Sequence, residues 1–350
     1  MHRREAELGH RLHATDAWPP KRHPRLPDRP GPRHRRRLRL ESMHGEPRIL
    51  ASTAPLLLSP VNWVLDAFAD AGFTEAELLL ARHPDSREPD RILARAQEAG
   101  LRIPVVHGPY MLLLRNVLGR AYIEKTRRSL EIARAVGAQT LVAHAPFRWE
   151  RRARGWLAAE ADDEAAEIGP SFAMENLYPV AGRNFSSVVT PQDLAPFRHV
   201  VFDTSHFAVA GIDLFDAWDA IGHQVVHLHV SDNHGAGKDN HAPIGTGTLP
   251  LAAFLAHVGR SGYSGTVTLE LDCRPHLDAR SELVAFWTRQ RQLAEALLAG
   301  EAAPDNDGPE HAERLAGDGH PTTDAGRATQ QTPGRPLIGD AQAKQGGRHE

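Results

Sequence analysis

The sequence predicts an α/β protein, a single (β/α)8 barrel over residues 48–300 with disordered N- and C-terminal extensions. Two observations support this fold class. Short apolar segments with strand character alternate strictly with segments of helical spacing, which is typical of a parallel sheet. Eight such pairs follow one another within about 250 residues, the number of units and the length that usually close a barrel.

The first four units place an apolar strand before each amphipathic helix. Glycines at 72, 100 and 137 mark where the first three helices should end. The fourth helix has a poor apolar pattern. The expected strands are residues 49–57, 75–82, 102–110 and 139–147, and the expected helices are residues 61–73, 90–100, 121–138 and 152–169.

The last four units continue the same alternation. Their strands are rich in Val, Phe, Thr and Leu, and several run directly into polar residues. The expected strands are residues 171–179, 199–211, 225–233 and 265–273, and the expected helices are residues 190–197, 213–222, 250–263 and 281–298. A doubly wound open sheet is the alternative architecture, but it normally has fewer strands. The absence of a Gly-rich phosphate loop from the sequence also disfavours nucleotide-binding folds.

The two ends differ in composition from the barrel. Residues 1–47 contain 12 Lys+Arg against 6 Asp+Glu, with many Pro and His, which predicts disorder. This segment could be a basic nucleic-acid arm, or translation could begin at Met43, which mass spectrometry of the native N-terminus would decide. Residues 301–350 have no periodic apolar pattern and are expected to form a solvated tail.

The barrel segment itself is acidic, with 24 Lys+Arg and 29 Asp+Glu in residues 48–300. This charge disfavours nucleic acid as a partner. Cys273 is the only cysteine, so neither an intrachain disulfide nor a Cys-rich zinc cluster is expected. No apolar run has the roughly 20 residues of a membrane span, so we expect a soluble, cytoplasmic protein without membrane contact. The sequence leaves the oligomeric state open.

Side chains that can bind metal stand at the ends of six consecutive strands. In this architecture the strand ends meet at one face of the barrel and build the active site. One such residue alone is more often structural, but burying many carboxylates and imidazoles together is costly unless a cation compensates them. The candidates are His107, His144, Glu175, Asp203, His206, His229, Asp239, His241 and Glu270.

These donors suit one to three divalent ions, with zinc or manganese as the metals they favour. Glu175, Asp203, His229 and Glu270 could hold one metal that leaves positions open for substrate oxygens. The remaining five could complete one or two further sites. Two or three metals bridged by a carboxylate suit phosphoester hydrolysis.

Other residues near the strand ends carry weaker signals. Tyr110 could contact substrate or simply pack at the rim, and Asn176 could contact substrate, orient ligands or cap a loop. Asn233 has the same two alternatives of orienting ligands or capping a loop. His227 is expected to be structural. The basic stretch 148–154 could bind a phosphate group, although a solvated loop and helix start is the simpler interpretation.

The ordered motifs VHGPY, LVAHAP, AMENLYP, FDTSH, HLHVSDN, DNHAPIGTG and VTLELD resemble the xylose isomerase-like barrel superfamily. That superfamily includes sugar phosphate isomerases and epimerases as well as the apurinic endonuclease called endonuclease IV. The resemblance covers roughly residues 48–298 and implies a TIM-type barrel with divalent metal at the strand ends.

The epimerase pattern within this resemblance implies that Glu175, Asp203, His229 and Glu270 bind the metal. It also implies that the two glutamates form the catalytic acid/base pair and that His206 contacts substrate. The endonuclease pattern uses all nine candidates for a trinuclear zinc site in which Glu175 bridges, and every position is matched.

The two patterns lead to different enzymes. The complete ligand set favours phosphoester chemistry, whereas the acidic barrel segment disfavours DNA binding. We therefore interpret the chain as a metal-dependent isomerase or epimerase of a small-molecule sugar or sugar phosphate. The alternative is an endonuclease IV-like zinc phosphodiesterase acting on abasic DNA or a small phosphodiester. A third hypothesis, a barrel that only binds a ligand, is opposed by the intact pair Glu175 and Glu270.

Overall fold

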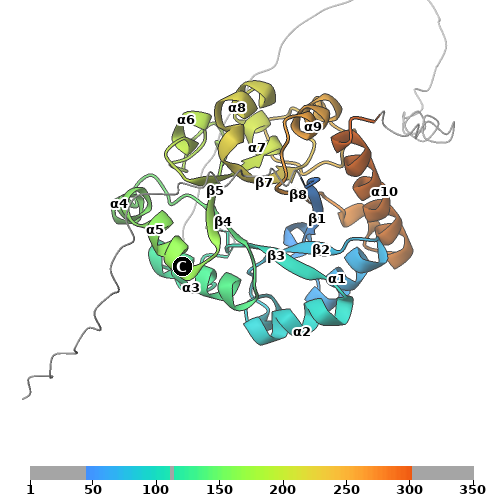
Figure 1. Ribbon diagram of the computed structural model, residues 1–350, viewed down its shortest axis with the longest axis horizontal. Coiled ribbons are helices and arrows are strands. Elements are labelled where there is room, and N and C mark those ends of the chain that lie inside the picture. The colour runs from blue at the N-terminus through green and yellow to red at the C-terminus, as the bar shows by residue number, and fades with distance from the viewer. Residues whose placement is uncertain (1–44, 111–113, 302–350) are drawn as a thin grey trace, which may run out of the picture. The chain divides into compact units, whose positions relative to one another are not determined.

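The computed structural model describes residues 45–110 and 114–301. Within this part of the chain, eight parallel strands close into a barrel in sequence order, and the last strand pairs with the first. Helices surround the ring of strands (Figure 1). The predicted (β/α)8 barrel is therefore confirmed. The basic N-terminal segment up to residue 44, the alternative start at Met43 and the tail after Glu301 lie outside the described residues.

Each strand is short and parallel to both of its neighbours. The strands are β1 (Arg48–Ser52), β2 (Glu75–Leu79), β3 (Arg102–His107), β4 (Thr140–His144), β5 (Ser171–Glu175), β6 (His199–Asp203), β7 (Val225–Val230) and β8 (Thr266–Leu269). Four of them, β3 to β6, end on a predicted metal ligand.

The helices follow the strands as predicted and range from one turn to five turns. They are α1 (Val61–Asp70), α2 (Pro89–Ala99), α3 (Tyr122–Ala135), α4 (Arg151–Ala159), α5 (Ala161–Ile168), α6 (Pro191–Leu194), α7 (Thr204–Val209), α8 (Leu214–Ile221), α9 (Leu251–Arg260) and α10 (Arg280–Leu298). Among the described residues, no helix is long and apolar enough to cross a membrane.

Several predicted strands are too long: β1 ends at Ser52 and is followed by a short 3-10 helix at Ala54–Leu56, β5 ends at Glu175 instead of residue 179, and β8 ends at Leu269 instead of residue 273. Two further elements differ more strongly. The sixth strand was expected over residues 199–211, but β6 ends at Asp203 and residues 204–209 form α7. The side chain of Asp203 accepts a hydrogen bond from His206 N and so caps this helix. The poorly patterned helix expected over residues 152–169 is two helices, because Glu160 leaves the helical conformation with φ −132° between α4 and α5.

The two larger parts of the apolar core follow from the alternation of side chains along each strand, and a smaller third cluster is formed by Ala54, Leu79, Ala81, Leu114 and Val117. One face of every strand packs outward against the helices, where large side chains such as Phe68, Phe202 and Trp287 are fully buried. The other face fills the barrel. A layer of small and branched residues closes the barrel interior, formed by Leu50, Val105, Val142, Ala173 and Val201.

Candidate metal centre

The metal-ligand candidates form the next inward-facing layer of the barrel. His107, His144, Glu175 and Asp203 each stand two positions beyond a residue of the interior apolar layer, on the same face of their strands. The register places His144 directly opposite Glu175, whereas His107 lies opposite Val142 and Glu175 opposite Val201, so the four side chains approach the barrel mouth from staggered positions. On each of these strands, a ligand candidate follows an interior apolar residue by two positions. This spacing places the donor atoms of the four side chains at the mouth of the barrel.

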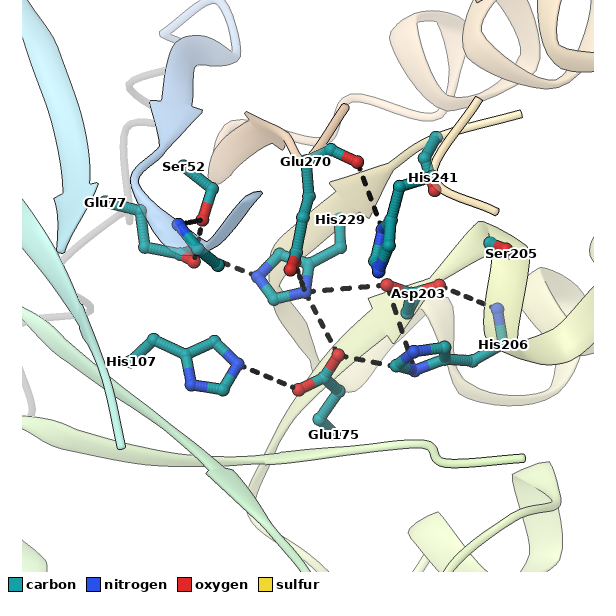
Figure 2. Close-up of polar contacts among 12 residues, drawn as sticks. Ser52, Glu77, His107, Glu175, Asp203, Ser205, His206, His229, His241 and Glu270 are labelled. Carbon is teal, nitrogen blue, oxygen red and sulfur yellow. Dashed lines mark hydrogen bonds and ion pairs between the residues drawn. The ribbon is translucent and has the colours of Figure 1, made fainter. Parts of the chain in front are cut away.

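Glu175 lies at the centre of these donors and contacts imidazoles from both sides (Figure 2). Its Oε2 is 3.3 Å from His107 Nε2 and 2.8 Å from His144 Nε2. Its Oε1 is 3.1 Å from His229 Nδ1. The carboxylate can therefore bridge two cations, one beside His107 and His144 and the other beside His229.

A second group joins the ends of β6, β7 and β8. His229 Nδ1 is 3.6 Å from Asp203 Oδ2 and 3.4 Å from Glu270 Oε2. One donor atom from each of Asp203, His229 and Glu270 lies within 4.8 Å of the others, a spacing that a single divalent ion could close. With Glu175, these are the four residues predicted to share one metal.

The third group combines α7 with the loop that follows β7. Asp239 Oδ2 is 2.9 Å from His241 Nε2 and 3.3 Å from His206 Nε2. His206 Nδ1 also lies 3.4 Å from Glu175, but it donates a hydrogen bond to the Asn176 carbonyl at 2.8 Å. Because Nδ1 carries that proton, we assign Nε2, beside Asp239, as the metal-binding atom of His206.

Carbonyl groups fix the orientation of two further imidazoles. Nδ1 of His107 donates to the Gly108 carbonyl at 2.7 Å, and Nδ1 of His241 donates to the Glu270 carbonyl at 3.1 Å. Each bond leaves Nε2 unprotonated in the neutral ring and directed toward a carboxylate. This arrangement is typical of metal-binding histidines.

Glu77 is a residue beside the ligand candidates that sequence reasoning missed. It is fully buried on β2 and joins two histidines of β7, with its Oε2 accepting from His227 Nε2 at 2.7 Å and from His229 Nε2 at 3.0 Å. Ser52 Oγ donates to its other oxygen at 3.0 Å. Since Glu77 occupies Nε2 of His229, Nδ1 becomes the atom that faces Asp203 and Glu270.

His227 lies one layer deeper than His229 and matches the structural role expected for it. It is fully buried, and its Nδ1 is 2.6 Å from Thr266 Oγ1. Because Nε2 donates to Glu77, Nδ1 of the neutral ring accepts from the threonine hydroxyl. Glu77, His227 and His229 could by spacing also hold an ion, but both ring nitrogens of His227 have partners already.

Several buried polar atoms at the centre have no hydrogen-bond partner. Among the described residues these include His107 Nε2 and His144 Nε2, which lie 3.3 Å and 2.8 Å from a third such atom, Glu175 Oε2, as close contacts of ion-pair type, and Asp203 Oδ2, which lies 3.6 Å from His229 Nδ1. Buried polar atoms without partners are rare and costly in folded proteins. A cation bound among them would satisfy all four, so the residues present fit a divalent metal of the borderline type that accepts imidazole and carboxylate.

The charges of the centre depend strongly on one another. Burial raises the pKa of Glu175, but the imidazoles of His144 and His229 outweigh it and hold this pKa well below its usual range. Burial lowers the pKa of His241, but Asp239 outweighs it and raises the pKa to about 9. The neighbouring histidines likewise outweigh burial at Asp239 and hold its pKa well below the usual range, so Glu175 and Asp239 are ionised at neutral pH, with positive charge beside them as protons or as metal.

The loop that carries Asp239 and His241 is held by hydrogen bonds from behind. Ser205 Oγ donates to Asp239 Oδ1 at 2.7 Å, and Asn233 Nδ2 donates to Ser205 Oγ at 2.9 Å. Asn233 Nδ2 also donates to the Lys238 carbonyl at 2.8 Å. These bonds engage Oδ1 of Asp239 and leave its Oδ2 facing His206 and His241. Asn233 therefore helps to orient the metal-ligand candidate Asp239 through Ser205.

Asp232 organises the second half of the same loop. Its buried carboxylate accepts from the backbone N–H groups of Gly245, Gly247 and Leu249 at 3.0–3.1 Å. Gly247 packs so closely that an added Cβ would lie 2.2 Å from Asp232 Oδ1. The IGTG motif is therefore a backbone cradle around one carboxylate, and its glycine at 247 is required by this close approach.

Tyr110 and Asn176 were both predicted to contact substrate. Tyr110 lines the cavity above the centre, where its hydroxyl donates to Glu270 Oε1 at 2.9 Å and its ring stacks on His144. Asn176 is fully buried, and its side chain exchanges hydrogen bonds with the backbone N–H and carbonyl of Asp203. Asn176 therefore supports the ligand strand from behind, which favours the orienting role over substrate contact.

Comparison with known proteins agrees with this architecture. Residues 65–295 match the family described as xylose isomerase-like TIM barrels. An uncharacterised protein of Mycobacterium leprae is 30% identical over 270 residues, which cover 70% of this chain and 94% of that protein. A putative hydroxypyruvate isomerase of Streptomyces coelicolor is 28% identical over 259 residues, which cover 63% of this chain and 87% of that protein. The crystal structure of a D-tagatose 3-epimerase-like protein superimposes with a TM-score of 0.57 and 16% identity, covering 72% of this chain and 97% of that one.

Proposed function

The chain belongs to the xylose isomerase-like TIM barrel family, and from this premise we propose that it is a metal-dependent isomerase or epimerase of a small sugar or sugar phosphate. One observation carries the proposal. Asp203, His229 and Glu270 present donor atoms within 4.8 Å of one another, and of these Glu270 lines a cavity that Glu175 lines as well. Both glutamates of the predicted acid/base pair line that cavity.

Glu175 and Glu270 differ in how they are held. Glu175 has imidazoles beside both of its oxygens, which suits a bridging ligand that returns a proton late in the reaction. Glu270 has one oxygen bound by the Tyr110 hydroxyl and the other 3.4 Å from His229. We assign Glu270 as the base that removes a carbon-bound proton. Glu175, whose pKa is held well below its usual range, would first take up the proton of a substrate hydroxyl and then return it as the acid.

A divalent ion held by Asp203, His229 and the two glutamates would polarise a ketose carbonyl and acidify the adjacent C–H bond. The protein would then supply the proton-transfer groups. Tyr110 keeps the Glu270 carboxylate in place, and Glu77 keeps His229 from rotating. His206 and His241 lie at the cavity edge, where they could contact substrate oxygens.

Glu270→Gln tests the assignment because it removes the base while keeping the shape of the side chain. We expect turnover to fall by roughly 10²- to 10⁴-fold with the fold intact. The assay is exchange of a substrate C–H proton for deuterium, followed by NMR across a panel of ketoses and ketose phosphates in D₂O. Glu98→Gln, on an exposed glutamate of α2, is the matched control and should keep full activity. Wild-type exchange in Glu270→Gln would refute the role of this residue.

A phosphodiesterase of the endonuclease IV type is the second candidate. The observation in its favour is the separation of the nine ligands into three neighbouring groups, with Glu175 shared between two of them. Metal content by inductively coupled plasma mass spectrometry discriminates the candidates. About three zinc ions per chain with cleavage of abasic-site DNA would support the phosphodiesterase, whereas about one divalent ion with C–H exchange would support the isomerase.

A further inference from the structure

The cavity above the metal-ligand candidates is lined by residues of two chemically different kinds. Its volume is about 260 Å³, near the lower end of small-molecule sites, which are typically about 300–1,000 Å³. Its floor consists of the carboxylates and imidazoles described above. The lining also includes a set of apolar and aromatic residues, namely Phe147, Leu177, Val180, Phe185 and Tyr178, whose ring centroid lies 4.7 Å from that of His206. A molecule in this cavity would therefore meet both polar groups and aromatic rings.

The apolar residues of the lining come from the loops after β4 and β5, which are tied to each other. Arg148 N donates to the Phe185 carbonyl at 3.0 Å, and Phe147 forms an antiparallel bridge with Ser186. Trp149 stacks on Phe147 with ring centroids 4.7 Å apart and meets Phe185 edge to face at 6.2 Å. We call Phe147, Trp149, Val180 and Phe185 the apolar wall.

Two side chains of the apolar wall are exposed to solvent, although large apolar side chains are usually buried. Trp149 is 62% exposed and Val180 is 45% exposed, and they are two of the four large exposed apolar side chains among the described residues. Clustered apolar exposure at the rim of a cavity commonly marks a binding surface. Phe147, Val180 and Phe185 line the cavity, whereas Trp149 lies outside its lining and packs against Phe147 and Phe185.

The same cavity offers no cation for a phosphate remote from the metal. Within the described part of the chain, no Lys or Arg lines it. Of the basic stretch 148–154, which the sequence suggests as a phosphate site, Arg151 and Arg154 are exposed on α4 and line a separate groove. Phosphate recognition generally relies on arginine, lysine or clustered backbone N–H groups.

We propose that the apolar wall is a subsite for an uncharged, apolar substituent, so that the substrate is an unphosphorylated ketose derivative carrying an aryl or alkyl group. This inference rests on the proposed isomerase function, since that function places the carbonyl and hydroxyl oxygens at the metal-binding floor. The substituent would then stack on Phe147 and Phe185, with Trp149 extending the contact toward solvent.

Binding of matched ketoses to the metal-loaded protein tests the subsite without requiring turnover. The probes are D-fructose, its 1- and 6-phosphates, 1-anilino-1-deoxy-D-fructose and 6-O-benzyl-D-fructose, each titrated by calorimetry. We expect one aryl derivative to bind at least about tenfold more tightly than D-fructose, in line with the strength of aromatic stacking. The phosphates should bind no more tightly than D-fructose.

Substitutions in the apolar wall test whether its side chains cause the tighter binding of the aryl ketoses. Trp149→Ala and Phe185→Ala should remove most of the aryl advantage and leave D-fructose binding nearly unchanged. Leu93→Ala, on an exposed leucine of α2 outside the cavity lining, is the control and should keep the advantage. Because Trp149 is largely exposed, its variant remains informative if Phe185→Ala proves unstable.

The possible results distinguish failure of the proposed subsite from failure of the proposed isomerase function. A phosphate ester that binds more tightly than both aryl ketoses, an aryl advantage that survives Trp149→Ala, or no binding by any probe would overturn the subsite. C–H exchange of D-fructose without any aryl preference would also overturn it and leave the isomerase standing. Wall-dependent aryl binding without exchange in any ketose would support the subsite's ligand chemistry and count against the isomerase.

Discussion

Glu77 connects the interior of the barrel to the chemistry at its mouth. One oxygen receives hydrogen bonds from two histidines on β7, and the other receives one from Ser52 on β1. Burial raises the pKa of Glu77, but His229 and His227 outweigh it and keep this pKa well below its usual range. The resulting negative charge fixes which nitrogen of His229 is presented to a metal.

Glu77→Gln should weaken metal binding without unfolding the chain. The amide oxygen can still accept from the histidines, but the charge that favours this orientation is lost. We expect metal affinity to fall by roughly 10- to 100-fold, as for other residues that support metal ligands. A competition assay with a chromogenic chelator measures it.

Glu75→Gln provides the matched control for that experiment. Glu75 is a buried glutamate on the same strand, but it pairs with Arg48 and Arg102 near the opposite end of the barrel. Its variant should retain wild-type metal affinity, whatever it does to stability. Equal affinities for the Glu77 variant and the wild type would contradict the positioning role.

The sequence could predict the ligand layer but not the residue behind it. The ligands stand out because imidazoles and carboxylates end several apolar strands in succession. Glu77 lies inside β2, where it resembles its neighbour Glu75, and nothing local separates the two. His227 was the feature of the sequence that could have pointed to Glu77. A histidine that faces the interior of a barrel needs a buried hydrogen-bond partner.

At the start of α7, the residue Asp203 has both a structural role and a place in the candidate metal centre. Asp203 ends β6 and caps α7 through Oδ1, while its Oδ2 has no hydrogen-bond partner and faces the metal centre. The sequence of this region is rich in Val and Phe, so its pattern favoured a continued strand. The capping aspartate was the local feature that outweighed this propensity.

The loop after β7 depends on close packing around Asp232, which makes Gly247→Ala a direct test of the cradle. The added methyl group would overlap Asp232 Oδ1 and the Asn233 carbonyl. We expect a loss of stability of about 1–3 kcal/mol and weaker metal binding by Asp239 and His241 on the same loop. Denaturant unfolding and metal titration measure the two effects.

Gly155→Ala controls for the general effect of replacing a glycine by alanine away from the Asp232 cradle. Gly155 lies on α4 with open space around its Cα, so alanine should be neutral or slightly stabilising there. If Gly247→Ala matched Gly155→Ala in stability and metal binding, the cradle would not be required for the loop.

Across the whole molecule, the metal-ligand candidates stand at the ends of six consecutive strands, β3 to β8. The strict alternation of the sequence sufficed to predict this closed topology, since eight regular units leave few alternatives. The number of bound ions depends on distances between side chains of separate strands, which no local pattern encodes. The same holds for the apolar wall, since its two loops meet only in the folded chain.

A cation held by ligands from several strands should stabilise the whole barrel. Removing metal by dialysis against a chelator is therefore expected to lower the melting temperature by about 5–10 °C, the shift expected when a ligand at about a hundred times its Kd is lost. Calorimetry with and without added zinc or manganese measures it. An unchanged melting temperature, with metal loss verified by mass spectrometry, would mean that the ligands do not stabilise the fold.

The apolar wall and the metal floor are built from different parts of the chain. The wall stands on two loops joined to each other, whereas the floor stands mainly on the ends of the strands and the loop after β7. Mutations in the wall can therefore accumulate during evolution while the reaction chemistry is preserved. A lineage could in this way acquire new substrates by exchanging two loops, and a protein engineer could follow the same route.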